Sequence, residues 1–265
     1  MIEICLNPDD ETLGSDSVEG DDEEFQSSRE MVLRMAERLL KELQPRPGGI
    51  GGDEVLNHRL LGNFLLLATR RKPNVEQAMQ DFASVASQEA YRDHVGTALG
   101  LAMAYMLLKQ VPRARNELKR FAKNVWNFED AEYLERCWLL LADIYIQNNK
   151  YDMASELLRR VLQHNKACTK AYEYAGYIAE KDQAYKDAAN QYEYAWKFGG
   201  QANPTIGYKL AFSYMKGKSY ADAIDVCQQV LRVQPDYPWI CKEILEKSRN
   251  NLRICLNYTF KQLYI

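Results

Sequence analysis

Residues 138–145 read Trp138-Leu139-Leu140-Leu141-Ala142-Asp143-Ile144-Tyr145, and this stretch decides the fold. Large side chains stand at both ends of the string, and one small residue, Ala142, lies between them. On a helix, residues three and four positions apart share a face. A small residue on that face lets the backbone of a second helix come close. The string therefore predicts a helix that pairs with another helix.

The residues that follow complete the pair. Tyr151, Ala154 and Leu158 supply an aromatic, a small and a large apolar position after the short turn Asn148-Asn149-Lys150. A W-x-x-L-G-x-x-Y first half and a second half of this kind are typical of the tetratricopeptide repeat, here with Ala in place of Gly. One unit is therefore predicted to be two antiparallel helices joined by a tight turn.

The same pattern recurs along the chain. Its clearest markers are the small residues of the second helices, at intervals of 36, 40, 34 and 35 residues: Ala78, Ala114, Ala154, Ala188 and Ala223. This repeat has a period of about 34 residues. One helix pair leaves an apolar face in water, so neighbouring units must stack on it. We expect an all-α tetratricopeptide-repeat solenoid of antiparallel helix pairs, a right-handed superhelix, with about five repeats in residues 53–235.

Two sets of side chains follow from this architecture. The residues expected to pack the repeats are Trp138, Leu141, Ala142, Tyr145, Ala154, Gly176, Ala188, Ala211 and Ala223. The first helix of each unit is expected to line a partner-binding groove with mostly apolar side chains, namely Leu99, Met103, Met106, Leu139, Ile146, Tyr177, Tyr208, Phe212 and Met215. An apolar stripe at helical spacing is also typical of core. For each groove residue, core and groove therefore stay open as alternatives.

The ends of the chain indicate further segments. Residues 1–8 resemble the end of a preceding repeat helix, so we expect the chain to be the C-terminal piece of a longer solenoid. Residues 9–25 form an acidic linker with nine acidic side chains and no basic one in 9–24. Such runs are disordered and also serve as docks for basic partners. A helix with a Gly/Pro loop is expected in 26–52, a capping helix in 236–256 and a tail in 257–265. The interval of 40 residues predicts an extended linker near Trp126, with Asp130 capping the next helix.

Composition limits the class of protein. A formal charge of −3 and a pI near 5.8 provide no basic field for nucleic acid or an anionic membrane. The first residues lack a signal sequence and no apolar run is long enough to span a bilayer, which predicts a soluble intracellular protein without membrane insertion. Six cysteines without a Cys-x-x-Cys pair indicate reduced, structural thiols.

No pattern of catalysis or cofactor binding accompanies the repeats. The three histidines, His58, His94 and His164, lack a His or Cys at ligand spacing, so no metal site is expected. The Gly48–Gly52 region lacks the Gly-Lys-Ser/Thr ending of a phosphate loop. No nucleophile elbow, dinucleotide fingerprint or kinase signature is present. We therefore expect no enzyme, no cofactor and no small-molecule substrate.

The ligand is expected to be a protein. Carboxylate-clamp tetratricopeptide domains hold chaperone tails with Lys, Asn and Arg on their first helices, whereas the clearest repeat here has Leu139, Leu140 and Asp143. This difference favours an apolar helix or another solenoid as ligand. A cytosolic co-chaperone-like adaptor that captures short C-terminal peptides remains the alternative.

Three longer strings resemble one family closely. Residues 57–69, 112–120 and 138–153 are similar to the C-terminal repeats of the large tetratricopeptide-repeat subunit of intraflagellar transport complex A, the tetratricopeptide repeat protein 21 family. The resemblance implies a non-catalytic scaffold that works with the other complex A subunits in retrograde ciliary transport and ciliary membrane-protein trafficking. It also implies a location in the cytoplasm, the ciliary axoneme and the basal body. The long N-terminal repeat array of the family is missing here, and the last apolar residues do not resemble the family.

Overall fold

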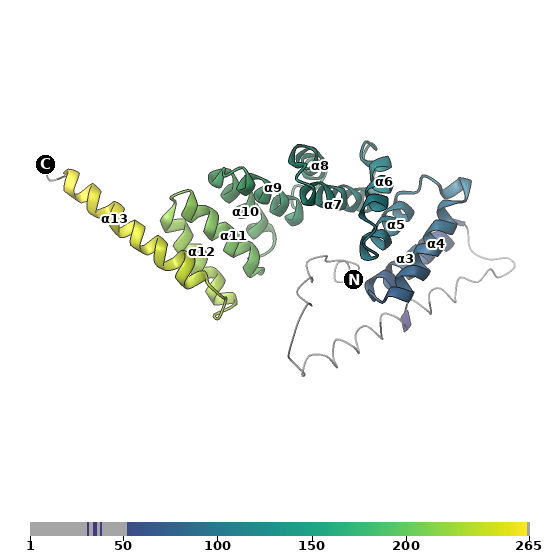
Figure 1. Cartoon of the computed structure of the whole chain (residues 1–265), viewed down its shortest axis with the longest axis horizontal. Coiled ribbons are helices and arrows are strands. Elements are labelled where there is room, and N and C mark those ends of the chain that lie inside the picture. The colour runs from purple at the N-terminus through teal and green to yellow at the C-terminus, as the bar shows by residue number, and fades with distance from the viewer. Residues whose placement is uncertain (1–30, 32–33, 36–37, 39–51, 264–265) are drawn as a thin grey trace. The chain divides into compact units, whose positions relative to one another are not determined.

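The computed structural model describes residues 31, 34, 35, 38 and 52–263, and the side chains of residues 31, 34, 35, 38 and 56–255. Every regular element in this part of the chain is a helix (Figure 1). The chain divides into two compact units, Met1–Cys137 and Trp138–Ile265. The expectations for residues 1–8 and 9–25, and for the Gly/Pro loop before Gly52, lie outside the described residues.

The helices form consecutive antiparallel pairs. The pairs are α3 (Gly52–Ala68) with α4 (Lys72–Ala86), α5 (Val95–Leu107) with α6 (Val111–Phe121), α7 (Ala131–Gln147) with α8 (Tyr151–His164), α9 (Thr169–Lys181) with α10 (Tyr185–Phe198), and α11 (Pro204–Lys216) with α12 (Tyr220–Val233). A single turn of 3₁₀ helix, Glu89–Tyr91, precedes α5. These hairpins confirm the all-helical repeat fold that the spacing of small residues predicts.

The turn inside the hairpins repeats one geometry. Lys109, Asn149, Gln183 and Lys218 each follow a first helix and adopt positive φ angles of 58°, 56°, 58° and 68°. In each turn, the N–H of the next residue donates to a carbonyl five residues back, as from Lys150 to Tyr145 at 2.8 Å. This is the Schellman arrangement, which satisfies the last carbonyls of a helix. The turns are therefore short enough to return the chain directly onto the preceding helix.

Small residues mark the crossing of the two helices in each pair. Ala102, Ala142 and Ala211 are buried at equivalent positions of α5, α7 and α11. The equivalent residue of α9 is Gly176, and a Cβ atom there would lie 2.7 Å from the Tyr192 ring of α10. Tyr192 is completely buried, and its ring fills the space that the Cβ atom of an alanine at position 176 would need.

A polar network joins the first two helices of the first unit. Asp81 of α4 accepts hydrogen bonds from Nε and Nη2 of Arg59 and from Nδ2 of Asn63, both on α3. Burial alone raises the pKa of Asp81, but the hydrogen bonds from Arg59 and Asn63 outweigh it and hold the pKa below its usual value. The network therefore fixes the register of α3 against α4.

The C-terminal helix extends further than predicted. A π-helical turn, Cys241–Leu245, leads into α13 (Glu246–Leu263), so the predicted end at residue 256 is wrong and residues 257–263 of the expected tail are helical. No Gly or Pro occurs after Pro238, so no residue type interrupts the helix. The predicted linker is present between Phe121 and Ala131, and the Asp130 carbonyl accepts the Leu134 N–H at 2.8 Å, as expected at an N-cap.

Candidate protein-interaction surfaces

The residues predicted to pack the repeats are buried. The two aromatics are nearly inaccessible, with Trp138 2% and Tyr145 4% exposed, and the alanines Ala142, Ala154, Ala188, Ala211 and Ala223 are at 0%. Leu141 and Gly176 are buried as well. These side chains stabilise the hairpins and are not available to a partner.

The residues predicted to line a groove divide into two groups. Leu99 and Ile146 are only 1% and 8% exposed, so they belong to the core and do not line the predicted groove. Helix α5 is buried continuously from Val95 to Ala102, which is why periodicity did not reveal the core position of Leu99. Half-buried positions are Met103 and Met106 in the first unit, and Leu139, Tyr177, Tyr208, Phe212 and Met215 in the second. Their contact with a partner stays a prediction.

Aromatic rings and lysines alternate on one face of α9 and α11. The Nζ atom of Lys181 lies 4.9 Å from the centroid of the Tyr177 ring, and that of Lys216 lies 5.4 Å from the centroid of Phe212. One turn earlier in α9, Lys170 lies 5.0 Å from the centroid of Tyr174. A cation over an aromatic face is stabilised by the ring quadrupole. We call the seven residues Lys170, Tyr174, Tyr177, Lys181, Lys209, Phe212 and Lys216 the lysine–aromatic face.

A half-buried carboxylate links the two helices of this face. Glu173 of α9 contacts Nζ of Lys209 at 2.7 Å and of Lys170 at 3.2 Å, and its side chain is only 14% exposed. Burial alone raises the pKa of Glu173, but the two lysines outweigh it and hold the pKa below its usual value. Glu173 is therefore ionised at neutral pH and positions Lys170 and Lys209 beside each other.

Tyr208 and Phe212 differ in their surroundings although both stand on α11. Tyr208 donates a hydrogen bond to Glu243 at 2.7 Å and packs on Tyr237 at a centroid distance of 5.8 Å. Phe212 meets Tyr185 edge to face at 6.4 Å. Tyr208 is thus held by the C-terminal segment, whereas Phe212 and Tyr177 form the apolar part of the lysine–aromatic face.

The lysines of this face were not predicted from the sequence, because the prediction of a groove rested on apolar stripes. The signal that could have found them is a lysine four residues after an aromatic residue, in Tyr177/Lys181 and again in Phe212/Lys216. The contact of Glu173 with Lys209 joins different repeats and leaves no local pattern. The face combines apolar rings with positive charge, so it suits a protein segment that carries both apolar and acidic side chains.

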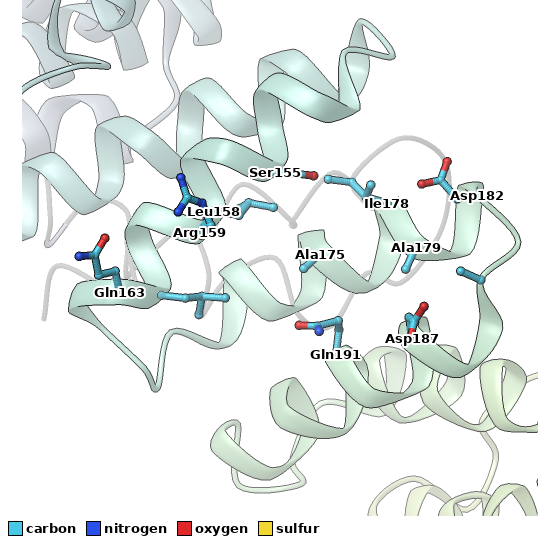
Figure 2. Close-up of a pocket in the computed structure, with 12 residues that line it drawn as sticks. Ser155, Leu158, Arg159, Gln163, Ala175, Ile178, Ala179, Asp182, Asp187 and Gln191 are labelled. Atoms are coloured by element: carbon cyan, nitrogen blue, oxygen red, sulfur yellow. The ribbon is translucent and has the colours of Figure 1, made fainter.

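The opposite side of α9 borders a groove of about 750 Å³ between α8 and α10 (Figure 2). Leu158 and Ile178 contribute apolar surface to it. Arg159 and Gln163 lie toward one end of the groove and Asp182 and Asp187 toward the other, as Figure 2 shows. The complete lining is Ser155, Leu158, Arg159, Leu162, Gln163, Ala175, Ile178, Ala179, Asp182, Ala184, Asp187 and Gln191. An apolar floor between charges of opposite sign suits one apolar side chain of a partner with charged neighbours.

Stacked aromatic rings are exposed near the end of the same hairpin. The Tyr172 ring lies 5.1 Å from Tyr194 and 5.8 Å from Phe198 between centroids. Tyr194 and Phe198 are 49% and 43% exposed. Tyr172 also donates its hydroxyl to the Lys166 carbonyl at 3.2 Å, which fixes the cluster.

The described residues contain no arrangement of the kind that supports metal chemistry. No group of three or more His, Cys, Asp or Glu side chains within them is placed to hold a metal ion. None of the described helices combines the length and the hydropathy needed to cross a bilayer. Cys137, Cys168 and Cys227 are buried free thiols, and burial raises the pKa of Cys227 to about 12. Burial raises the pKa of the Cys137 thiol as well, so Cys137 and Cys227 stay protonated and unreactive at neutral pH.

Solved repeat proteins share this fold. A chain of the APC/C hetero-tetramer Cut9-Hcn1 matches with a TM-score of 0.57 over 85% of this chain and 40% of that chain, at 14% identity. YrrB, described as a TPR protein with an unusual peptide-binding site, matches with a TM-score of 0.52 over 68% of this chain and 87% of its own, at 13% identity. At such identities the likeness establishes the fold alone, and it confirms the tetratricopeptide-repeat class.

Sequence comparison identifies the family. Residues 35–249 match the tetratricopeptide repeat protein 21 C-terminal ARM domain. Tetratricopeptide repeat protein 21B of Homo sapiens is 54% identical over 259 residues, and tetratricopeptide repeat protein 21A of Mus musculus is 52% identical over 258. Each match covers 96% of this chain and 19% of the relative, so the chain spans about a fifth of their length. The resemblance predicted from residues 57–69, 112–120 and 138–153 is confirmed, and the chain belongs to the tetratricopeptide repeat protein 21 family.

Proposed function

We propose that this chain is a non-catalytic scaffold region of intraflagellar transport complex A that acts in retrograde ciliary transport and in the trafficking of ciliary membrane proteins. Its partners are the other subunits of that complex, and its place is the cytoplasm, the ciliary axoneme and the basal body. Family membership over residues 35–249 is the observation that supports this assignment, because the ciliary role is inferred from the family.

The lysine–aromatic face supplies the contact in this proposal. Tyr177 and Phe212 are half-buried and lie beside Lys181 and Lys216 on adjacent repeats. Burying one such ring under a partner contributes roughly 1.5 to 3 kcal/mol. Each exposed ion pair to a lysine adds only about 0.2 to 1 kcal/mol. The rings therefore provide most of the affinity, and the lysines select acidic segments and speed the encounter.

Affinity capture from ciliated cells tests both parts of the proposal. The tagged chain is compared with a variant that reverses the face, Lys181→Glu with Lys216→Glu, and with the matched control Lys197→Glu with Lys242→Glu. The control lysines are also exposed and lie in the same unit. We expect the wild-type chain and the control to retain complex A subunits and the face variant to retain at least tenfold less.

The two ways in which this experiment can fail are distinct. Recovery of no complex A subunit by the wild-type chain, while the full-length relative recovers them in parallel, contradicts the ciliary assignment. Equal recovery by the wild-type chain and the face variant contradicts the role of the lysine–aromatic face. Circular dichroism of each variant verifies that the helices are intact.

A second candidate function draws on the same lysines. The pair Lys170 and Lys209, held by Glu173, would attract the terminal carboxylate of a short peptide, as a co-chaperone-like adaptor requires. Against this reading, Leu139 and Asp143 occupy the corresponding region of the preceding repeat. Titration with an acidic peptide in free-acid and C-terminally amidated forms separates the functions. An affinity that depends on the free carboxylate supports the adaptor, and equal affinities support a scaffold that binds internal segments.

A further inference from the structure

The exposed side of α6 in the first unit is basic. Arg113, Lys119, Arg120 and Lys123 are exposed, while Ala114, Leu118 and Phe121 on the other side of the helix are buried. From Arg113 to Arg120 the helix rises about 11 Å, at roughly 1.5 Å per residue, and Lys123 follows in the turn after the helix ends at Phe121. Four cations therefore stand along one short strip, which we call the basic strip.

Most of the basic strip lacks a carboxylate partner within the part of the chain that the structure describes. Arg120 is paired with Glu117 at 3.2 Å and with Asp93 at 2.8 Å. Arg113 donates only to the Gln110 amide oxygen, at 2.9 Å, and no ion pair of the described residues includes Lys119 or Lys123. The strip therefore carries excess positive charge in a protein whose formal net charge is −3.

The lysine–aromatic face differs from this strip in the contacts that its lysines already make. There, Lys181 and Lys216 lie over aromatic rings and Glu173 neutralises part of the charge of Lys170 and Lys209. In the basic strip, Arg113 lies over the Tyr105 ring at 5.9 Å and Arg120 over the Phe121 ring at 5.6 Å from the centroid, and no such contact of the described residues includes Lys119 or Lys123. Its occupant is consequently defined by charge more than by apolar contact.

The acidic segment of this chain has the matching charge and length. Residues 21–24 read Asp21-Asp22-Glu23-Glu24, a run of four carboxylates within sixteen residues, 9–24, that contain no basic side chain. Four extended residues reach about 13 Å, close to the roughly 11 Å from Arg113 to Arg120 along α6. Four negative charges can thus be set against the three cations of the strip without a carboxylate partner among the described residues, Arg113, Lys119 and Lys123.

The connection between the two elements is long enough for this contact. Residues 25–51 separate the acidic run from the start of α3 at Gly52. Even as one continuous helix these residues would span about 40 Å, which exceeds the roughly 30 Å diameter of a small domain. Covalent connection gives the acidic run a local concentration of about millimolar, so that individually weak ion pairs suffice for docking.

We propose that Asp21–Glu24 dock on the basic strip of α6 within the same molecule. The contact pairs the strip's cations with carboxylates of the same chain. Salt weakens the contact, because the screening length falls from about 10 Å at 0.1 M to about 3 Å at 1 M. A partner that offers a better acidic segment displaces residues 21–24 from the strip.

Zero-length carbodiimide cross-linking of the whole chain tests the proposal, because the reagent joins a carboxylate to a lysine only where the two are in contact. Links are mapped by mass spectrometry at low salt. We expect links from residues 21–24 to Lys119 and Lys123 to exceed those to the exposed control lysines Lys197 and Lys242 by threefold or more. The links should also fall by threefold or more in 1 M salt and stay constant on dilution.

A charge exchange completes the test. Lys119→Glu with Lys123→Glu should abolish the links, and replacing residues 21–24 by lysine in that background should restore links between the same two segments. Equal links to the control lysines, failure of the exchange, or links that vanish on dilution would overturn the proposal. The last result assigns the strip to a second molecule. Circular dichroism of the variants, whose changed positions 119 and 123 are exposed, excludes unfolding as the cause.

Discussion

Replacing Gly176 by Ala should destabilise the fourth hairpin, although alanine is present at the equivalent positions of neighbouring repeats. Ala142 pairs in sequence register with Leu158, and Ala102 with Leu118, whereas Gly176 pairs with Tyr192. A Cβ atom on residue 176 would lie 2.7 Å from two carbons of the Tyr192 ring. The ring has no room to move, because Tyr192 is fully buried and its hydroxyl donates to Glu180 at 3.0 Å.

Two opposing effects set the magnitude. Alanine in place of glycine favours a helix interior by about 1 kcal/mol. Overpacking a tight core costs about 1 to 3 kcal/mol, and contacts under 3 Å place this site toward the upper end. We therefore expect a net loss of about 1 to 2 kcal/mol in the free energy of unfolding.

A double-mutant cycle isolates the packing effect. Tyr192→Leu alone should cost about 2 to 4 kcal/mol, because it leaves a cavity under Gly176. Combined with Gly176→Ala, it recreates the Ala/Leu pair of the neighbouring repeats, so the double variant should be more stable than the sum of the single changes by about 1 to 2 kcal/mol.

Urea unfolding followed by circular dichroism measures these differences. Stacked repeats can unfold in parts, so hydrogen exchange of α9 and α10 amides should localise the loss. A Gly176→Ala variant as stable as the wild type, or a double variant whose losses simply add, would refute the packing argument.

Three further predictions address the rest of the chain. Asp81→Asn should destabilise α3–α4 by about 1.5 to 3 kcal/mol at pH 7. Because the folded pKa of Asp81 is lowered, this stabilisation decreases as pH falls below about 4, so the difference between variant and wild type in urea unfolding should narrow with falling pH, and a constant difference would contradict this. Gln183→Gly, at a φ of 58°, should raise the thermal midpoint through about 0.5 to 1 kcal/mol of relieved strain, and a lowered midpoint would contradict the turn geometry. Thiol labelling mapped by mass spectrometry should modify the exposed Cys241 and Cys255 before the buried Cys137, and equal rates would contradict the core assignment.

The fold was predictable because its determinants are local and repeated. Ala154 and Ala188 recur near the period of one helix pair, so their spacing alone indicates hairpins. The turns were located, but not their geometry, since Lys109 and Gln183 are not residue types that favour positive φ. The end of α13 was misplaced because no stop signal follows Pro238.

The candidate surface was predicted only in part. Tyr177 and Phe212 were found from helical spacing, but spacing cannot distinguish exposure on α5, where apolar residues occupy every side of the helix and Leu99 is core. The lysines of the face become significant only through Glu173, whose contact with Lys209 joins helices of different repeats. Such contacts between units depend on tertiary packing and leave no sequence period.

In the proposed function, the lysine–aromatic face of α9 and α11 holds a protein partner. Hydrogen exchange of the chain, free and bound to purified complex A subunits, measures this contact most directly. We expect slowed exchange in α9 and α11 on binding, with α10 and α12 little changed. Protection confined to other helices, or none at a saturating concentration of partner, would contradict it.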